Sequence, residues 1–277
     1  MIAVLLAVYN SGRFLREQID SIFAQTFSDW KIFVHDDGST DDTLSILQSY
    51  IEAWPDKIAF IDNRATGLRA CGSFLALQEA VKADYYMFSD HDDVWLPDKM
   101  ELSVKRMQEV ETLHPDRPVI VHTDMKVVDS ALNVIGDSFW TYMKLLPDHC
   151  SFAELAVCHC VNGCTILFND QAKRLIGPGK DRALMHDILL SESVAEAGGI
   201  ISAVRQPTVL YRQHGDNVLG AASITGNGLA RRFFRLKEVF RESEKSRRAA
   251  CAVRRLSRLE FYLVKMKIEV LRLWRYR

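Results

Sequence analysis

Three carboxylates lie within four positions in the stretch Ser89-Asp90-His91-Asp92-Asp93-Val94-Trp95, which follows directly on the apolar run Tyr85-Tyr86-Met87-Phe88. Carboxylates this close repel one another unless a positive charge lies among them. A divalent cation near the end of a strand explains the crowding, because Mg²⁺ and Mn²⁺ prefer oxygen ligands and leave coordination positions for phosphate oxygens. The stretch therefore favours a nucleotide-diphosphate site. An acidic loop that only caps the next helix is the alternative.

A second acidic turn, His35-Asp36-Asp37-Gly38-Ser39-Thr40-Asp41-Asp42, follows the strand-like run Trp30-Lys31-Ile32-Phe33-Val34. In an open parallel sheet the ligand crevice lies at the carboxyl ends of the strands, so we expect both turns at one cleft. Gly38 permits a tight turn, and Asp41 or Asp42 is expected to cap the next helix. A turn and cap signal accounts for one such turn but not for its repetition.

Apolar periodicity alternates between strand and helix through the first half of the chain, which is typical of βαβ units. The first predicted helix has an apolar stripe that includes Phe14, Ile19 and Phe23. We therefore expect a parallel sheet flanked by helices. The predicted strands cover 2–8, 30–35, 57–62, 85–89 and 119–122, and the predicted helices cover 13–25, 41–53, 68–82 and 97–113.

The chain has 277 residues, enough to bury a sizeable core. Its apolar start, residues 1–8, is too short to span a membrane and lacks the basic flank of a signal peptide, so we interpret it as a buried strand. No other stretch reaches membrane-spanning length, so we expect the protein on the cytoplasmic side. Cys158 and Cys160 are separated by one residue, whereas structural zinc usually uses Cys-x2-Cys pairs. We expect them, with Cys164, to be small buried apolar residues.

The opening Leu6-Ala7-Val8-Tyr9-Asn10 and the two acidic turns resemble, in order and spacing, the inverting glycosyltransferases of family 2. One departure is His91, where the bacterial rhamnosyltransferase-like branch of that family more often has Gln. The likeness covers roughly residues 1–220. Three later segments resemble this branch, namely Asn162-Gly163-Cys164-Thr165, Met185-His186-Asp187 and Tyr211-Arg212-Gln213-His214-Gly215-Asp216-Asn217.

The resemblance implies an α/β GT-A fold: a Rossmann-like, mostly parallel sheet flanked by helices, with a C-terminal helical extension. It implies a catalytic domain over 1–222, in which 1–123 bind the nucleotide sugar and 124–222 the acceptor. The composition of 223–277 predicts a basic amphipathic helical extension. Mg²⁺ or Mn²⁺ is the implied cofactor. The implied nucleotide-sugar-binding residues are Ala7, Tyr9, Asn10, Asp36, Asp37, Arg64, Arg69, Asp90 and Arg212, and the implied metal ligands are Asp90, Asp92, Asp93 and His214.

Sugar transfer needs a base, because an acceptor hydroxyl is a poor nucleophile until its proton is removed. By resemblance Asp187 occupies the catalytic-base position, although an Asp there can also be a helix N-cap. His186 orients that carboxylate, touches the donor or is an ordinary packed histidine. Trp140 is a sugar platform or ordinary core. The implied acceptor-side residues are Gly163, Cys164, His186 and Trp140.

The C-terminal part of the chain is basic. Residues 228–277 contain sixteen Lys or Arg and five Asp or Glu, a balance of +11, which leaves about −12 for the rest. The runs 231–236 and 253–259 predict basic amphipathic helices that lie on acidic lipid headgroups, where a lipid-linked acceptor is found. Packing against the catalytic domain or a second subunit is the rival. The acidic part opposes binding of nucleic acid.

The sequence thus predicts metal-dependent, inverting transfer of a sugar from a dTDP- or UDP-linked donor to a cell-surface glycan or lipid-linked acceptor, at the inner face of the cell membrane. L-rhamnose as the sugar rests on resemblance alone. We expect Gly215 and Gly220 to flank a loop that closes over the donor, with a plain surface turn as the alternative. A non-catalytic nucleotide-sugar-binding scaffold is the alternative function. A nucleotidyltransferase more often has a Gly-rich basic loop after the first strand, and Tyr9-Asn10-Ser11-Gly12 is not one.

Overall fold

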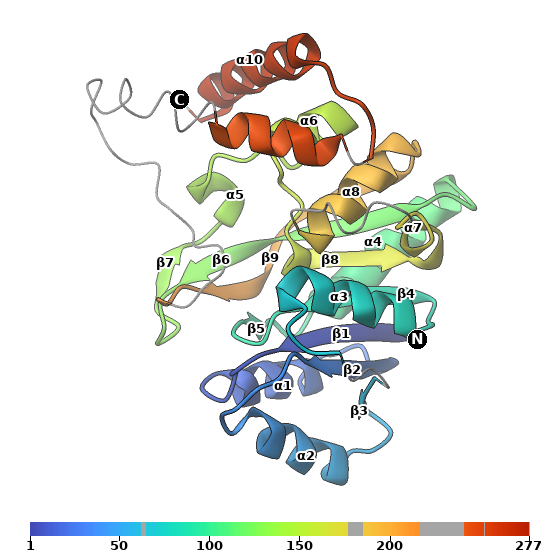
Figure 1. Cartoon of the computed structure of the whole chain (residues 1–277), viewed down its shortest axis with the longest axis vertical. Helices are drawn as coiled ribbons and strands as arrows, with labels where there is room; N and C mark the ends of the chain where they lie inside the picture. Colours follow the sequence, from blue (N-terminus) through green and yellow to red (C-terminus); the bar gives the residue numbers. More distant parts are fainter. Residues whose placement is uncertain (62–64, 177–184, 216–240, 252, 277) are drawn as a thin grey trace.

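The structure is a computed structural model and describes residues 1–61, 65–176, 185–215, 241–251 and 253–276. Within them nine strands form one sheet, in the order β3-β2-β1-β4-β8-β6-β9-β5, with β7 paired to β6 (Figure 1). The first four strands are parallel: β1 (Ile2–Val8), β2 (Trp30–Asp36), β3 (Ile58–Phe60) and β4 (Tyr85–Ser89).

Antiparallel pairing begins beyond β4. Strand β8 (Ile166–Asn169) pairs antiparallel with both β4 and β6 (Val119–Val128). Strand β9 (Ile200–Arg212) is parallel to β6 and pairs at its far end with the two-residue β5 (Val94–Trp95). Because β5 directly follows the acidic turn, this pairing brings the end of β9 beside that turn. Strand β7 (Val134–Gly136) is antiparallel to β6.

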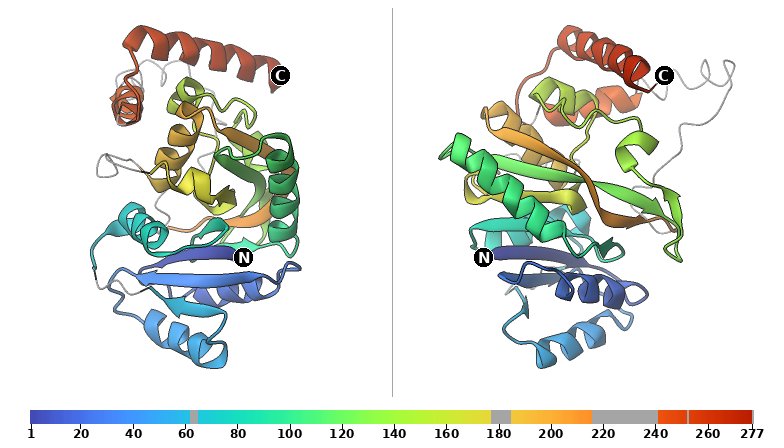
Figure 2. Two further views of the ribbon diagram at one scale, coloured as in Figure 1. Left: turned by 90° about the vertical axis from the view of Figure 1, so that its right-hand side faces the viewer. Right: turned by 180° about the vertical axis from the view of Figure 1, so that it is seen from behind.

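Helices cover both faces of the sheet. Figure 2 shows α3 and α8 on one side and α4 on the other. All seven residues of β1 are buried, as expected for a central parallel strand covered on both faces. The helices are α1 (Leu15–Phe23), α2 (Thr43–Ala53), α3 (Arg69–Ala80), α4 (Lys99–Leu113), α5 (Phe139–Tyr142), α6 (Phe152–Val157), the 3-10 turn η1 (Gly163–Thr165), α7 (Asp170–Lys173), α8 (His186–Glu196), a helical stretch over 241–250, and α10 (Arg258–Arg275).

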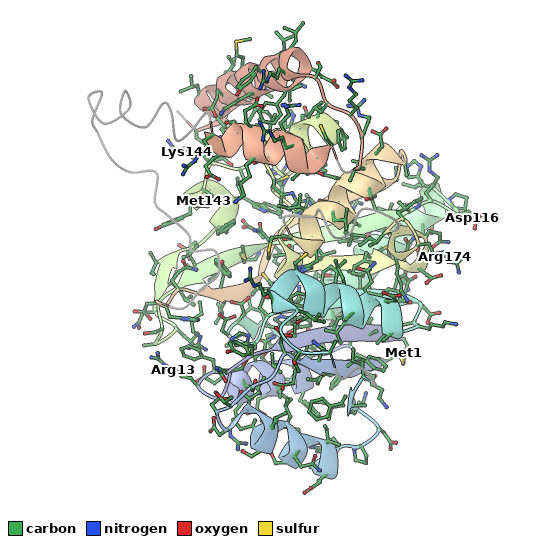
Figure 3. All side chains as sticks on the ribbon, viewed as in Figure 1. Met1, Arg13, Asp116, Met143, Lys144 and Arg174 are labelled. Atoms are coloured by element: carbon green, nitrogen blue, oxygen red, sulfur yellow. The ribbon has the colours of Figure 1, made fainter. Side chains whose placement is uncertain are left out.

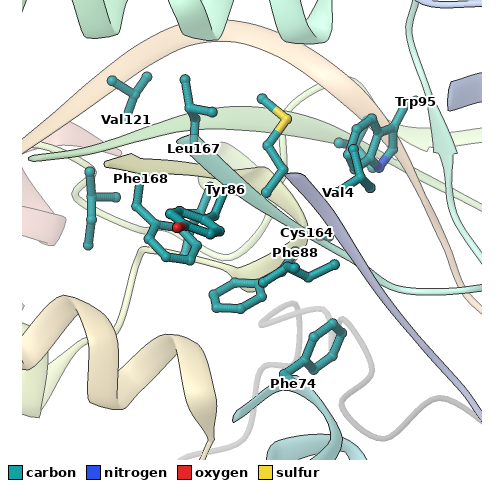
Figure 4. Packing of buried hydrophobic residues seen from close by; sticks show 14 of the residues in the cluster. Val4, Phe74, Tyr86, Phe88, Trp95, Val121, Cys164, Leu167 and Phe168 are labelled. Atoms are coloured by element: carbon teal, nitrogen blue, oxygen red, sulfur yellow. The ribbon is translucent and has the colours of Figure 1, made fainter. Parts of the chain in front are cut away.

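An aromatic core lies where α3 packs on β4 and β8 (Figure 4). The rings of Phe74 and Phe88 meet edge to face with centroids 5.3 Å apart, and Tyr86 stacks on Phe168 at 5.3 Å. Cys164 is buried in the same cluster. The expectation that Cys158, Cys160 and Cys164 are buried is confirmed. This packing fixes the end of β4, from which the acidic turn extends.

The predicted elements of the first half agree with the structure to within a few residues at each end. Strand β6 is longer than predicted, because it continues beyond residue 122 alongside β9. The helix expected over 253–259 is wrong in position: the side chain of Ser257 accepts a hydrogen bond from Glu260 N, so α10 begins at Arg258. The predicted run 231–236 lies outside the described residues. No described helix is long and apolar enough to cross a bilayer.

Candidate active site

The three carboxylates of the turn after β4 point in different directions. Asp93 points inward: its side chain is 0% exposed, and Oδ1 accepts a hydrogen bond of 3.1 Å from Arg212 N. Asp92 is partly exposed, and its Oδ2 lies 2.9 Å from Nε2 of His214. Asp90 is also partly exposed. The predicted ligands Asp90, Asp92, Asp93 and His214 are thus brought to one place, with Asp93 behind the others.

The turn holds more negative charge than its surroundings balance. Burial, with the charges of Asp92 and Asp187, raises the pKa of Asp90 to about 7. Burial and the charges of Asp92 and Asp90 raise the pKa of Asp93 well above its usual range. Asp93 Oδ2 is buried and has no hydrogen-bond partner among the residues that the structure describes. Asp90, Asp93 and Cys164 each offer a ligand atom within 4.8 Å of the others. Unsatisfied carboxylate oxygens of this kind fit a divalent cation.

A buried cation, Lys99, lies on the inner side of the turn and was missed by the sequence analysis. Its side chain is fully buried, and burial lowers its pKa to about 8, although the charges of Cys164 and Asp93 oppose that shift. Nζ lies 4.7 Å from the ring centroid of Trp95. The signal was available, because Lys99 is four residues from the buried Ser103 on the inward face of α4. Lys99 partly balances Asp93 from within the protein.

Arg212, at the end of β9, links segments that are distant in sequence. Its Nε donates to Asp92 O at 2.8 Å, and an Nη donates to Ser130 O at 2.8 Å. The other Nη pairs with the carboxylate of Glu17, and the guanidinium lies 4.3 Å from the ring centroid of Phe14. The side chain is buried. These contacts position the acidic turn; a contact of Arg212 with phosphate stays a prediction.

The turns after β1 and β2 are hydrogen-bonded to each other. Asn10, whose φ is 47°, donates from its backbone N to Ser39 Oγ at 2.9 Å and accepts from Thr40 N at 2.9 Å. Asp37 accepts from the backbone N of Leu68 and of Arg69, at 2.7 and 2.8 Å, and so holds the start of α3. Both turns therefore lie at one edge of the sheet, as predicted from their place after parallel strands.

Other predicted donor residues lie along the same edge. Asp36 accepts from the backbone N of Gly38 and Ser39, which forms the tight turn. Ala7 makes a backbone hydrogen bond with His91, and the ring of Tyr9 is 56% exposed and open to a ligand. Arg69 is exposed with φ at 60°, a strained value for a residue other than glycine. Arg64, Asp216, Asn217 and Gly220 lie outside the described residues. The donor-binding roles of all these residues stay predictions.

Asp187 lies in the first turn of α8, facing the 3-10 turn η1. The N-cap of this helix is Met185. Asp187 Oδ2 accepts a hydrogen bond of 2.9 Å from Gly163 N and lies 3.9 Å from Nε2 of His159. Cys164, the residue after Gly163, has its sulfur within 4.8 Å of carboxylate oxygens of Asp90 and Asp93, so η1 connects Asp187 to the acidic turn. The assignment of Asp187 as the base stays a prediction that this position supports.

His186 is packed beneath Asp187. Its ring stacks on Phe74 with centroids 4.0 Å apart and meets Phe88 edge to face at 4.5 Å. Burial lowers its pKa to about 4, so the imidazole is neutral at pH 7. A Cβ on Gly163 would lie 2.9 Å from His186 Nε2, which explains the glycine. His186 therefore has the position of a packed residue that orients its neighbour.

Trp140 lies away from this group. It is buried, its ring centroid is 5.3 Å from that of His122, and its carbonyl accepts a hydrogen bond of 3.3 Å from the hydroxyl of Tyr276. Of the two alternatives for Trp140, ordinary core describes its surroundings here. Gly163, by contrast, is hydrogen-bonded to Asp187, and Cys164 lies next to Asp93 of the acidic turn. The site thus combines the ends of β1, β2, β4 and β9 with η1 and the start of α8.

The sequence profile described as Glycosyl transferase family 2 matches residues 3–140, which include all three turns that follow β1, β2 and β4. The chain belongs to glycosyltransferase family 2. The dTDP-rhamnosyl transferase RfbG of Shigella flexneri is 29% identical to this family 2 chain over 256 residues, which cover 84% of this chain and 82% of RfbG. An uncharacterized glycosyltransferase of Nostoc is 35% identical over 136 residues.

The family 2 chain is shorter than several of its relatives. It covers 37%, 52% and 40% of the proteins matched in Rickettsia prowazekii, Rickettsia typhi and Nostoc, so it spans about half their length or less.

Two kinds of solved structure show the same fold. S. aureus TarS in complex with UDP-GlcNAc superimposes with a TM-score of 0.60 and 15% identity, over 97% of this chain and 71% of that one. The mannosyltransferase PcManGT of Pyrobaculum calidifontis, in complex with GDP-Man and Mn²⁺, gives 0.54 and 16%, over 100% and 88%. The predicted GT-A fold is confirmed.

Proposed function

We propose that this family 2 chain is an inverting glycosyltransferase that moves a sugar from a nucleotide-diphosphate donor to a hydroxyl of a glycan or lipid-linked acceptor. The observation that carries the proposal is the convergence of two groups at η1: Asp187, at the start of α8, is bonded to Gly163 N, and the next residue, Cys164, has its sulfur within 4.8 Å of carboxylate oxygens of Asp90 and Asp93 in the acidic turn. One group suits the diphosphate end of a donor and the other suits an attacking hydroxyl. Residues 1–123 would bind the donor and 124–222 the acceptor.

Asp90, Asp92, Asp93 and His214 are the residues that would hold Mg²⁺ or Mn²⁺. Asp90 and Asp92 are partly exposed, whereas Asp93 is fully buried and its Oδ1 is bonded to Arg212 N. Asp90 and Asp92 would therefore face the donor, and Asp93 would offer its second oxygen from the inner side of the turn. A bound divalent ion would neutralise charge that builds on the departing diphosphate.

Asp187 would take the proton from the acceptor hydroxyl. A single base is enough for inversion, because the hydroxyl attacks from the face opposite the leaving diphosphate. The hydrogen bond from Gly163 N fixes the direction of one carboxylate oxygen, and the packed His186 fixes the backbone next to it. The second oxygen is directed by Ile188 N. The base is therefore held in place before the acceptor arrives.

We propose dTDP-L-rhamnose as the first donor to test. RfbG, which is named as a dTDP-rhamnosyl transferase, aligns with this chain over most of both sequences. The neighbours of known structure carry UDP-GlcNAc and GDP-Man on the same fold, so the fold by itself does not select the base or the sugar. We propose that the protein acts at the inner face of the cell membrane, because nucleotide sugars are made on the cytoplasmic side.

Calorimetric titration tests the proposal. The purified chain is titrated with dTDP-rhamnose, UDP-glucose, UDP-galactose and GDP-mannose, each with Mn²⁺ and with a chelator. We expect one donor to bind with Mn²⁺ only, and Asp92→Asn to remove that binding while the exposed Asp56→Asn retains it. Donor binding followed by no transfer to any acceptor glycan would favour the nucleotide-sugar-binding scaffold. Absence of binding for every donor with Mn²⁺ would refute the proposed site.

A further inference from the structure

Helix α10 has two apolar faces, and only one is covered by the described residues. Phe261 and Ile268 are buried on the inner face, where α10 packs on α6. Lys267 pairs with Glu154 of α6 at 2.8 Å, and the hydroxyl of Tyr276 donates to the carbonyl of Leu145 at 2.5 Å. This inner face attaches α10 to the body of the molecule.

Helix α10 lies at the edge of the molecule opposite α2, as Figure 1 and Figure 3 show, and the side chains of its second apolar face are exposed. The side chains of this face, which we call the outer stripe, are between 52% and 79% exposed. They recur at helical spacings of three and four residues along about 22 Å of helix, given 1.5 Å per residue. The outer stripe consists of Leu259, Leu263, Met266, Val270, Leu273 and Trp274.

The outer stripe is set in a strongly basic segment. Residues 241–276 contain eleven Lys or Arg and four Glu, which leaves a balance of +7. Arg255, Arg258, Lys267 and Arg275 are exposed, although three of them also pair with carboxylates: Arg258 with Glu244, Lys267 with Glu154 and Arg275 with Asp148. An exposed apolar face with basic flanks and a terminal Trp has the composition of a helix that lies in the interface of an anionic membrane. The charge complements phospholipid headgroups and repels a second positively charged copy.

Pairing of two α10 helices is a weaker explanation of the same pattern. The spacing is that of a coiled-coil seam, whose stability and partner choice depend on opposite charges at the flanking positions. In a parallel pair, the residues that flank the seam on one helix would lie opposite those of the other helix. Glu269 would then face Trp274 and Lys267 would face Tyr262, and neither contact is an ion pair. In an antiparallel pair centred on Met266, Lys267 would face its own copy. The flanks therefore do not specify a dimer.

We infer that the outer stripe of α10 is a docking surface for anionic lipid, with its apolar side chains among the acyl chains and its Arg and Lys side chains at the headgroups. Helix α10 packs on α6, and the segment after α6 leads to Gly163 and hence to Asp187. The lipid surface would then adjoin the acceptor side of the site. This step rests on the proposed function and narrows its acceptor class to a glycan anchored in the membrane.

Vesicle flotation of the full chain tests the inference. Vesicles of phosphatidylcholine are compared with vesicles containing about one third phosphatidylglycerol, at low and high salt. We expect binding to the anionic vesicles, weakened by salt. The double variant Leu263→Glu/Val270→Glu should bind them about tenfold less tightly or more weakly still, because two apolar side chains that would insert among the acyl chains are replaced by charges. Both positions are exposed, so the variant should fold.

A matched control carries the same kind of change elsewhere. Leu44 and Leu113 are exposed on α2 and α4, and Leu44→Glu/Leu113→Glu should float like the unchanged chain. Equal binding of the stripe variant, or no binding to anionic vesicles at all, would overturn the inference. A concentration-dependent dimer in light scattering that only the stripe variant loses, without flotation, would assign the surface to a second copy instead. Vesicle binding needs no donor, so donor titration separately decides the proposed function.

Discussion

Asp187 combines a solvent-accessible position with a fixed orientation. One oxygen accepts from Gly163 N at 2.9 Å and the other from Ile188 N at 2.8 Å. An amide oxygen can accept only one of these two hydrogen bonds, and an amide does not take a proton from a hydroxyl. Replacement of this residue by Asn therefore removes the proposed base together with one of its two hydrogen bonds.

We expect Asp187→Asn to lower sugar transfer by about a hundredfold or more, the usual scale of general-base catalysis, and to leave donor affinity unchanged. Transfer is followed by release of nucleoside diphosphate, and donor affinity by calorimetry. Asp170→Asn, at the start of the short helix α7, is the control for an Asp near a helix N-terminus away from the site. Transfer that survives in Asp187→Asn would show that another residue is the base.

Gly163 allows a close approach between η1 and α8. A Cβ there would lie 2.9 Å from His186 Nε2 and 3.5 Å from Asp187 Oδ2. We expect Gly163→Ala to cost about 1–3 kcal/mol of stability by overpacking and to lower kcat by displacing the base. Gly136→Ala is the matched control, because its Cβ would lie 3.0 Å from a ring carbon of Tyr142, far from the base. Equal kcat in folded samples of both variants would contradict the positional role.

Helix α8 also carries a buried carboxyl group, Glu192. Asp187, by contrast, is partly exposed in the first turn of the same helix. Burial raises the pKa of Glu192 to about 8, so this side chain is neutral at pH 7. A carboxyl whose pKa is raised on folding stabilises the folded state below its unfolded pKa, near 4.5, and that contribution is lost as pH rises through about 8. The stability of α8 therefore depends on keeping this proton.

We expect the free energy of unfolding to fall by a few kcal/mol between pH 5 and pH 9, and Glu192→Gln to remove the share due to Glu192 while the share due to Asp90 persists. Urea unfolding at several pH values measures the slope. Glu109→Gln, on the exposed face of α4, should leave the slope unchanged. A slope that is the same in Glu192→Gln as in the unchanged chain would assign the pH dependence to other groups.

Elements with a strong period were predictable from sequence, whereas their partners in the second half of the sheet were not. The continuous apolar run of β1 predicts that both of its faces are buried, as they are. The two residues of β5 carry no period, and they form a strand only because β9 pairs with them. The burial of Lys99, and that of Arg212, which the sequence predicts as a donor-binding residue, is explained by their neighbours in three dimensions.

At the scale of the whole molecule, the candidate site gathers the carboxyl groups of Asp90, Asp92 and Asp93 at the place where we propose a cation. Because the pKa of Asp90 is raised to about 7, deprotonation of the turn destabilises the protein as pH rises from about 4 to 7. A divalent ion competes with protons for the same oxygens. The proposed metal binding would therefore be coupled to stability through pH.

We expect Mn²⁺ to raise Tm more at pH 8 than at pH 5.5, because protons occupy the carboxyl groups at the lower pH. Differential scanning fluorimetry with and without Mn²⁺ measures the shift. Ca²⁺ at the same concentration controls for ionic strength, and Asp92→Asn should lose the shift at both pH values. An increase in Tm that is equal at both pH values would place the ion elsewhere.

Arg212 makes the acidic turn depend on residues that a ribosome adds much later. The turn ends at residue 93, yet the carboxylate of Asp93 and the backbone oxygen of Asp92 gain their hydrogen bonds only from Arg212 of β9, 119 and 120 residues downstream. The contact to Glu17 spans 195 residues. Such distant contacts form slowly, so a nascent chain would hold three unbalanced carboxylates until β9 docks. Catalytic competence would thus be among the last properties that this chain acquires during synthesis, and partly made chains could not consume donor.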